Sequence, residues 1–167
     1  MGPLFVAWVP EGLTLLRFGG EPPPDEARRW LPEAAAARGA PVPEVVRDRL
    51  SRYFDGEDVD PAELPVRLDG TGFQRRVWSA LRHVPRGRVR TYGGLASDVG
   101  SPRAMRAVGL AMAKNPLPVV VPCHRVVAAG MGLGGYSGGL ERKRFLLELE
   151  GVKLEGGRVL PGQLELL

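Results

Sequence analysis

The stretch TYGGLASDVGSPRAMRAVGLAMAK, residues 91–114, predicts two short helices joined by a tight turn. Thr91 stands where a helix N-cap is expected, and Gly100 stands where that first helix should end. Ser101 and Pro102 then supply an N-cap and a first helical residue for a second helix, which should run to the end of the stretch. Two helices connected in this way are typical of a helix-turn-helix, although many helical domains contain such corners.

The second of these helices is expected to present an unusual surface. Arg103, Arg106 and Lys114 fall near one face of it. The other residues along it are mostly small: Ala104, Ala107, Gly109, Ala111 and Ala113. Small residues allow close approach to a partner, and the cations could contact phosphates or enter a groove. Alternatively, the arginines are solvated and Lys114 complements the helix dipole. In that case the core residues are Ala104, Val108, Ala111 and Met112, and Met105 also serves in packing.

The segments before this stretch predict one more helix and a separate small α/β unit. Residues 71–84 place Phe73, Val77, Leu81 and Val84 along one helix face. The expected elements of the first unit are a hairpin of strands 4–9 and 13–18, an interrupted helix over 25–41, a helix over 43–54 and a possible strand, LPVRL, over 64–68. That unit contains no evident catalytic constellation.

The charge of the chain is divided unevenly. Residues 1–69 carry 8 Lys/Arg and 13 Asp/Glu, for −5, whereas residues 70–155 carry 14 and 5, for +9. Residues 156–167 add one of each, which returns the net +4 of the whole chain. This division predicts two domains, 1–69 and 70–167, of which the second faces a polyanion. The alternative is a solvated, arginine-rich surface.

The composition also limits the compartment and the cofactors. No apolar run approaches the roughly 20 residues of a membrane span, and the first residues lack the features of a signal peptide. One cysteine cannot form an internal disulfide or a cysteine-rich zinc site. We therefore expect a cytoplasmic protein with no membrane partner.

The single cysteine lies in VVVPCHRVV, residues 119–127. The preceding residues predict a short buried strand that proline ends just before Cys123. A free cysteine is often a small buried hydrophobe, and a reactive one needs a base or positive charge nearby. His124 and Arg125 follow at once, but adjacent side chains on an extended chain point apart. His124 would need a tight turn, or a bridging water, to take the thiol proton.

A carboxylate that could orient this histidine follows near the end of the chain. Residues 140–151 predict an amphipathic helix with an apolar side formed by Leu140, Phe145, Leu146 and Leu149. Glu150 falls in its last turn, where it opposes the helix dipole at a cost of roughly 0.3–1 kcal/mol and so suggests a compensating partner. The glycine-rich segment 128–140 between them permits close approach to a flat ligand, or is a flexible connection.

These residues together resemble a known family. PCHRV, its lead-in NPLPVVVPCHRV, the RAVG of the second helix and the later GYSGG are similar to the O6-alkylguanine-DNA alkyltransferases, also called methylated-DNA–protein-cysteine methyltransferases. The resemblance is strong over residues 70–154 and extends to 1–69 in general layout. It implies an α+β chain of two domains, with an N-terminal ribonuclease-H-like α/β domain and a C-terminal winged-helix-like domain that contains the helix-turn-helix.

The resemblance also implies roles for the residues around the thiol. Cys123 would accept the alkyl group of O6-alkylguanine, and His124, oriented by Glu150, would take the thiol proton through a water. Asn115 would brace the turn before the site. The hydroxyl of Tyr92 would lie near guanine N3 and help to discharge the leaving base.

Further residues are implied for the base and the duplex. The backbone carbonyls of Cys123 and Val126 would accept from the guanine amino group, and Ser137, beside Tyr136, would donate to O6; Met112 is a further candidate for the substrate pocket. Arg106 would fill the stack when the base is flipped out, with its helix in the minor groove. The complete set of expected DNA contacts is Arg106, Arg103, Ala107, Gly109, Lys114 and Tyr92.

The expected activity is a single, self-inactivating transfer of the alkyl group, with O4-alkylthymine as a possible secondary substrate. The partner would be double-stranded DNA that carries O6-alkylguanine, bound by a monomer without cofactor. Some members of the family hold zinc through N-terminal cysteines and histidines, and residues 1–69 contain neither, so no metal is expected. Two other classes stay open. A cysteine hydrolase also uses Cys and His, although normally far apart in sequence, and a purely DNA-binding protein would explain the charge but not PCHRV.

Overall fold

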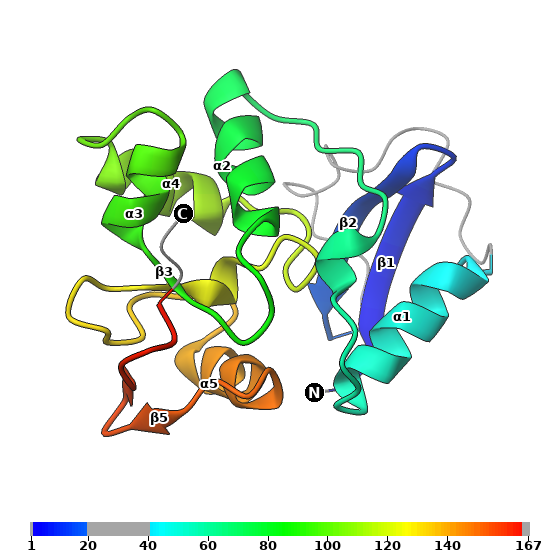
Figure 1. The fold of residues 1–167 in the computed structure, drawn as a ribbon. Helices are drawn as coiled ribbons and strands as arrows, with labels where there is room; N and C mark the ends of the chain where they lie inside the picture. The colour runs from blue at the N-terminus through cyan, green and yellow to red at the C-terminus, as the bar shows by residue number, and fades with distance from the viewer. Residues whose placement is uncertain (1, 20–40, 165–167) are drawn as a thin grey trace. The chain divides into compact units, whose positions relative to one another are not determined.

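The computed structural model describes residues 2–19 and 41–164 (Figure 1). The chain forms two compact units: Met1–Asp69 together with Pro116–Val120, and Gly70–Asn115 together with Val121–Leu167. The short segment before the cysteine thus belongs to the first unit. The interrupted helix expected from residue 25 falls on residues outside the described ranges.

The first unit is built on a hairpin and one helix. Strands β1 (Leu4–Val9) and β2 (Gly12–Phe18) pair antiparallel, as the sequence predicts. Helix α1 (Glu44–Phe54) begins after Pro43, and its buried residues, Val46, Leu50 and Tyr53, recur at helical spacing. This helix was also predicted correctly.

The segment LPVRL does not form the strand that its composition suggests. Val66 makes a single parallel bridge to Leu13, through bonds from the Leu13 N–H to the Pro65 carbonyl and from the Arg67 N–H to the Leu13 carbonyl. Pro65 has no N–H to extend the ladder. A short 3-10 helix, η3 (Pro61–Glu63), precedes it. The described part of this unit is mixed α/β; its likeness to ribonuclease H stays a prediction.

The second unit begins with helix α2 (Gly72–Arg82). A reciprocal capping box between Thr71 and Gln74 starts it, and Val77, Trp78 and Leu81 are buried. The helix ends before Val84, which is nevertheless fully buried in the loop. The face predicted from apolar spacing is therefore correct apart from the position of its end.

The helix-turn-helix segment has the predicted first helix but a shorter second one. Helix α3 (Tyr92–Asp98) is capped by the Thr91 side chain, which accepts from the Gly94 N–H at 3.0 Å. Helix α4 (Met105–Ala113) begins after Ala104, so Ser101 and Pro102 are not its N-cap and first residue. Ser101 still closes the previous helix, because its N–H bonds the Ala96 carbonyl at 2.8 Å.

Two consequences follow for the side chains of α4. Arg103 lies in the turn before the helix rather than on its face. Met105 is 52% exposed, so its predicted packing in the core is wrong, whereas Met112 and Val108 are buried as expected.

The apolar run before the cysteine is buried but is not a strand. Val119 has a φ of +76°, in the left-handed region, and the chain turns there. Extended structure returns after the cysteine, where β4 (Val126–Val127) pairs parallel with β3 (Arg90–Thr91). This pairing joins the segment that follows Cys123 to the residues just before α3.

The final helix buries only part of the predicted apolar side: Leu146 is buried and Leu149 half-buried. In α5 (Leu140–Leu149) the buried residues are Lys143, Leu146 and Leu147, while Leu140 and Phe145 are 52% and 42% exposed. The chain then forms the hairpin β5 (Leu154–Glu155) and β6 (Arg158–Val159). Within the described ranges no helix is long and apolar enough to cross a bilayer.

Candidate functional site

The cysteine lies in a single turn of 3-10 helix, η4 (Cys123–Arg125). The turn follows Pro122 and is closed by a bond from the Arg125 N–H to the Pro122 carbonyl at 2.9 Å. Cys123 is 5% exposed and His124 is fully buried. The local structure is therefore the tight turn that an adjacent histidine requires, and not an extended segment.

The histidine is paired with Glu150. His124 Nε2 lies 2.9 Å from Glu150 Oε1, and both side chains are fully buried. An ionised carboxylate can only accept, so His124 Nε2 carries the proton and Nδ1 keeps a free lone pair. Among the described residues, Nδ1 has no hydrogen-bond partner. Burial, despite the charge of Glu150, lowers the pKa of His124 below its usual value. The imidazole is thus a neutral base.

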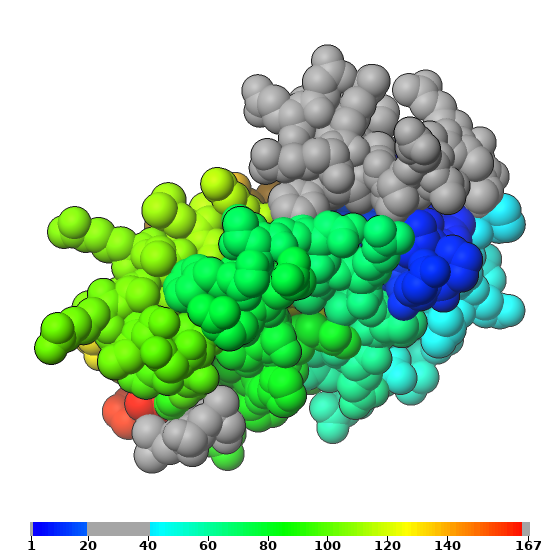
Figure 2. Space-filling model, turned by 90° about the horizontal axis from the view of Figure 1, so that it is seen from above, coloured from blue at the N-terminus to red at the C-terminus, as the bar shows by residue number. Residues whose placement is uncertain are grey.

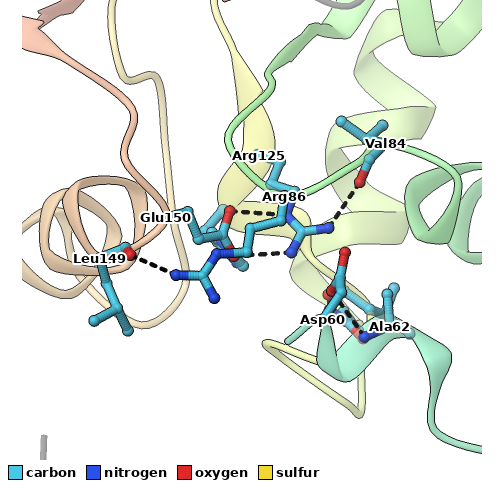
Figure 3. Close-up of polar contacts among 10 residues, drawn as sticks. Asp60, Ala62, Val84, Arg86, Arg125, Leu149 and Glu150 are labelled. Atoms are coloured by element: carbon cyan, nitrogen blue, oxygen red, sulfur yellow. Dashed lines mark hydrogen bonds and ion pairs between the residues drawn. The ribbon is translucent and has the colours of Figure 1, made fainter. Parts of the chain in front are cut away.

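Arg125 supplies the charge that makes this carboxylate tolerable (Figure 3). Its Nε donates to Glu150 Oε2 and its Nη2 to Glu150 Oε1, each at 2.9 Å, and its Nη1 donates to the Val84 carbonyl at 2.7 Å. Burial alone would raise the pKa of the Glu150 carboxyl, but the contacts with His124 and Arg125 hold it well below its usual range. Sequence reasoning did not identify this partner, although its adjacency to His124 was visible.

Glu150 is held at the end of a helix whose carbonyls are also satisfied. It is the C-cap of α5, where a negative charge opposes the helix dipole. Arg86 offsets this locally, because its Nη2 donates to the Leu149 carbonyl at 2.8 Å (Figure 3). The Glu150 carboxylate itself is bonded by His124 and Arg125, while Arg86 satisfies the neighbouring helix carbonyl.

Asn115 contacts both the cysteine and the turn before it. Its Nδ2 lies 2.8 Å from the Val121 carbonyl and 3.1 Å from Cys123 Sγ. Burial raises the pKa of the Cys123 thiol, while the hydrogen bond from Asn115 and the charge of Lys143 oppose that rise. The resting thiol is therefore protonated at neutral pH, and a base is needed to make it nucleophilic.

Tyr92 lies between α4 and the glycine-rich segment. A Cβ on Gly109 would lie 3.9 Å from its Cε1, and a Cβ on Gly134 would lie 3.1 Å from its Cε2. Its hydroxyl is 3.4 Å from the Gly135 carbonyl. Burial raises the pKa of Tyr92, and the nearby Cys123 contributes in the same direction. The hydroxyl therefore stays a proton donor.

The second aromatic residue of this segment, Tyr136, is held close to the backbone. A Cβ on Gly138 would lie 2.6 Å from the Tyr136 ring, so only glycine fits there without a shift. The Tyr136 hydroxyl is buried and has no partner among the described residues. Burial raises its pKa, with a further contribution from Cys123. The neighbouring Ser137 is exposed.

A buried lysine fixes the glycine-rich segment, and sequence reasoning missed it. The Lys143 side chain is fully buried, and its Nζ donates to the carbonyls of Val126, Leu133 and Gly135. It thereby ties the strand after the cysteine to the middle of the segment. The Val126 carbonyl, expected to accept from guanine, already accepts this bond. Nothing in the sequence indicates that Lys143 is buried, because a lysine among other charged residues of a helix is expected to be solvated.

Apart from Tyr92, which is the first residue of α3, the expected DNA-contacting residues lie on α4, at its C-cap and in the turn before it. Arg106 and Lys114 are exposed on α4 and at its C-cap, and Arg103 is exposed in the preceding turn. Ala107 and Gly109 are half-buried. The described residues contain no group of three His, Cys, Asp or Glu that could hold a metal ion.

Comparisons with known proteins identify the family of this chain. Residues 72–152 match the family model described as "6-O-methylguanine DNA methyltransferase, DNA binding domain". The methylated-DNA–protein-cysteine methyltransferase of Mycobacterium tuberculosis H37Rv is 45% identical over 152 residues, which cover 90% of this chain and 87% of that protein. That of Methanosarcina acetivorans is 40% identical over 152 residues, with 90% and 93% covered.

A solved structure is similar as well. The crystal structure of M. tuberculosis OGT in complex with DNA has a TM-score of 0.72 at 42% identity, and the match covers 89% of this chain and 86% of that one. The fold and these matches define the class of DNA methyltransferases whose acceptor is a protein cysteine. The chain belongs to the methylated-DNA–protein-cysteine methyltransferase family.

Replacing Lys143 by Met should change how stability depends on pH. Burial lowers the pKa of Lys143 from 10.5 to about 8. Between these values the unfolded chain binds a proton that the folded chain has released, so wild-type stability should rise relative to Lys143→Met as pH increases through this window. The full shift corresponds to roughly 3 kcal/mol. Urea unfolding of both proteins at pH 7 and pH 10 measures the difference, and a parallel pH dependence would contradict the burial of the charge.

Proposed function

We propose that this protein repairs O6-alkylguanine in duplex DNA by transferring the alkyl group irreversibly to Cys123. The observation that carries the proposal is the buried pair His124–Glu150, which leaves His124 Nδ1 as a free base in the turn that bears the thiol. A structural cysteine would need neither the base nor the carboxylate that orients it.

The transfer is an in-line displacement at the alkyl carbon. A water relays the Cys123 proton to His124 Nδ1, and the resulting imidazolium is stabilised by the ionised Glu150. The sulfur then forms a bond to the alkyl carbon while the bond from that carbon to guanine O6 breaks. The electron pair of the broken bond stays on guanine, and a proton donated at N3 by Tyr92 neutralises it. The tyrosinate then regains a proton from water, and the imidazolium of His124 releases the proton that it took from Cys123. The product thioether is a poor leaving group, so nothing in the chain regenerates the thiol.

The base would be bound next to the thiol by groups from three segments. Tyr92 and the glycine-rich segment that holds Tyr136 and Ser137 provide the walls. The carbonyls of Cys123 and Val126 are the proposed acceptors for the guanine amino group. Val126 can serve although it already accepts from Lys143, because a carbonyl oxygen has two lone pairs. Met112, buried on α4, is the further pocket residue. O4-alkylthymine would be a secondary substrate.

Access to the base requires that it leave the stack. We infer that α4 lies in the minor groove, with Arg106 in place of the extruded base and Arg103, Lys114, Ala107 and Gly109 near the backbone. The exposure of Arg106 and the positive charge of residues 70–155 support this. The similar M. tuberculosis protein, solved in complex with DNA, supports the choice of partner.

The finer expectations belong to the same proposal. They are a monomeric, cytoplasmic protein without cofactor, a ribonuclease-H-like domain over 1–69 and a winged-helix-like domain over 70–167. The hydrolase and pure-binder alternatives predict no covalent change in the protein. Mass spectrometry after incubation with O6-methylguanine DNA separates the three classes, because this proposal requires one added methyl group on Cys123.

Repair should be stoichiometric. Each molecule should accept one alkyl group, and Cys123→Ser or Cys123→Ala should abolish transfer while duplex binding persists, because the groove-facing groups lie elsewhere. Titration of labelled O6-methylguanine DNA with increasing protein measures the ratio. Repeated turnover by one protein molecule would refute an irreversible transfer.

Glu150→Gln should slow the transfer more than it weakens binding. The amide keeps the shape but removes the charge that stabilises a protonated His124, so the rate should fall roughly 10²-fold and the apparent pKa of the reacting thiol should rise. Duplex affinity should change little. The measurement is single-turnover transfer between pH 6 and 9.

The same substitution leaves the Arg125 guanidinium buried without its counter-charge, so a control for folding is necessary. Glu150→Asp keeps the charge and should retain more activity than Glu150→Gln. The thermal transition of each variant shows whether it is folded at the assay temperature. Wild-type rates for Glu150→Gln across this pH range would remove Glu150 from the proton relay.

Arg106→Ala should slow repair of duplex DNA by roughly tenfold or more, because the unstacking cost of a few kcal/mol is no longer offset. Reaction with free O6-benzylguanine needs no base flipping and should be unaffected. The control is Arg47→Ala on α1, whose side chain is 69% exposed. An equal loss on both substrates would mean that Arg106 supports the fold or the pocket.

A further inference from the structure

The exposed face of α4 carries one large apolar side chain. Leu110 is 66% exposed, although the opposite side of the helix is buried through Val108, Ala111 and Met112. Met105 is also exposed, but it lies about 140° around the helix from Leu110, and its Sδ would be 3.6 Å from a Cβ on Gly93 of α3. Figure 2 shows side chains projecting into solvent from the lime-green surface of this part of the chain. A single exposed apolar side chain is ordinary, so the residues around Leu110 decide whether it marks a contact surface.

The positions of these residues form rows along the helix. Residues four apart lie on one line of a helix surface. Arg106, Leu110 and Lys114 therefore make one row, in which an apolar residue stands between two cations. Met105 begins the adjacent row, whose next member is Gly109. Beside Leu110 the surface is thus low, and the leucine side chain stands above it.

The charge around these rows identifies the chemistry of the partner. Between Asp98 and Glu141 the sequence contains no carboxylate, while Arg103, Arg106 and Lys114 are exposed. A partner must therefore offer apolar surface between two lines of negative charge. The minor groove of duplex DNA does so, because its sugar walls lie between two rows of phosphates.

We propose that Leu110 packs against the sugar walls of the minor groove of an intact duplex, while Arg106 and Lys114 engage its two edges; Arg106 leaves its edge only when a base is flipped out. Eight residues of helix separate the cations by about 12 Å, enough to cross a groove about 6 Å wide. The inference rests on the proposed function, and it assigns to Leu110 a share of duplex affinity that is independent of charge. An apolar side chain at the groove also favours the widening and partial unstacking that precede base flipping.

The test measures duplex affinity against salt concentration for Leu110→Ala, Leu110→Met and Arg106→Ala, with unmodified duplex DNA. Leu110→Ala should bind roughly tenfold more weakly at every salt concentration, and Leu110→Met should restore most of the affinity. The slope of log affinity against log salt should be unchanged, since an apolar contact releases no counterion. Arg106→Ala should reduce the steepness of that slope by about 0.9 per lost phosphate contact.

The control is Val45→Ala on α1, another exposed apolar residue, at 58% exposure. It should not alter duplex affinity, and Leu110→Ala should react normally with free O6-benzylguanine. Wild-type affinity for Leu110→Ala, a changed salt slope or an equal loss with free O6-benzylguanine would overturn the inference. A wild-type protein that neither binds duplex DNA nor gains a methyl group would overturn the proposed function itself, so the two failures are distinguishable.

Discussion

The buried ion pair between Arg125 and Glu150 is the interaction on which the site depends. A carboxylate at the C-terminal end of a helix and out of contact with water would ordinarily be protonated or expelled. Two hydrogen bonds from the guanidinium keep it charged, and the same side chain reaches the Val84 carbonyl. The pair therefore joins the cysteine turn, the end of α5 and the loop after α2. Removal of either partner leaves an uncompensated buried charge.

Once Glu150 is ionised and fixed, the state of the histidine follows. Nε2–H must face the carboxylate, so the basic nitrogen is the other one. Burial keeps the imidazole neutral and the Cys123 thiol protonated, so the resting site holds no free thiolate. In the proposed transfer, the thiol proton therefore has to reach His124 before the sulfur can attack.

The glycine-rich side of the proposed base pocket is built differently. Lys143 donates hydrogen bonds to three backbone carbonyls, one in β4 and two in the glycine-rich segment. None of these three bonds is to a carboxylate. Gly134 and Gly138 leave space for the two tyrosine rings. The glycine-rich segment is in this way held by the buried Lys143. The rings of Tyr92 and Tyr136 occupy the space that glycines leave because they have no Cβ.

The sequence by itself determined the hairpin, α1, α2 and α3, because apolar periodicity and capping residues act within a few positions of the chain. It also singled out Cys123 and His124, which are adjacent, and Glu150, whose place at a helix end implied a partner. It misplaced the start of α4 and part of the buried face of α5, and it predicted a strand where the chain turns at Val119. It also missed the pairing of Arg125 with Glu150 and the burial of Lys143. Those features are decided by contacts between distant segments. A charged side chain can be buried only where the fold brings a counter-charge or backbone carbonyls to it, and no local sequence pattern predicts such a contact.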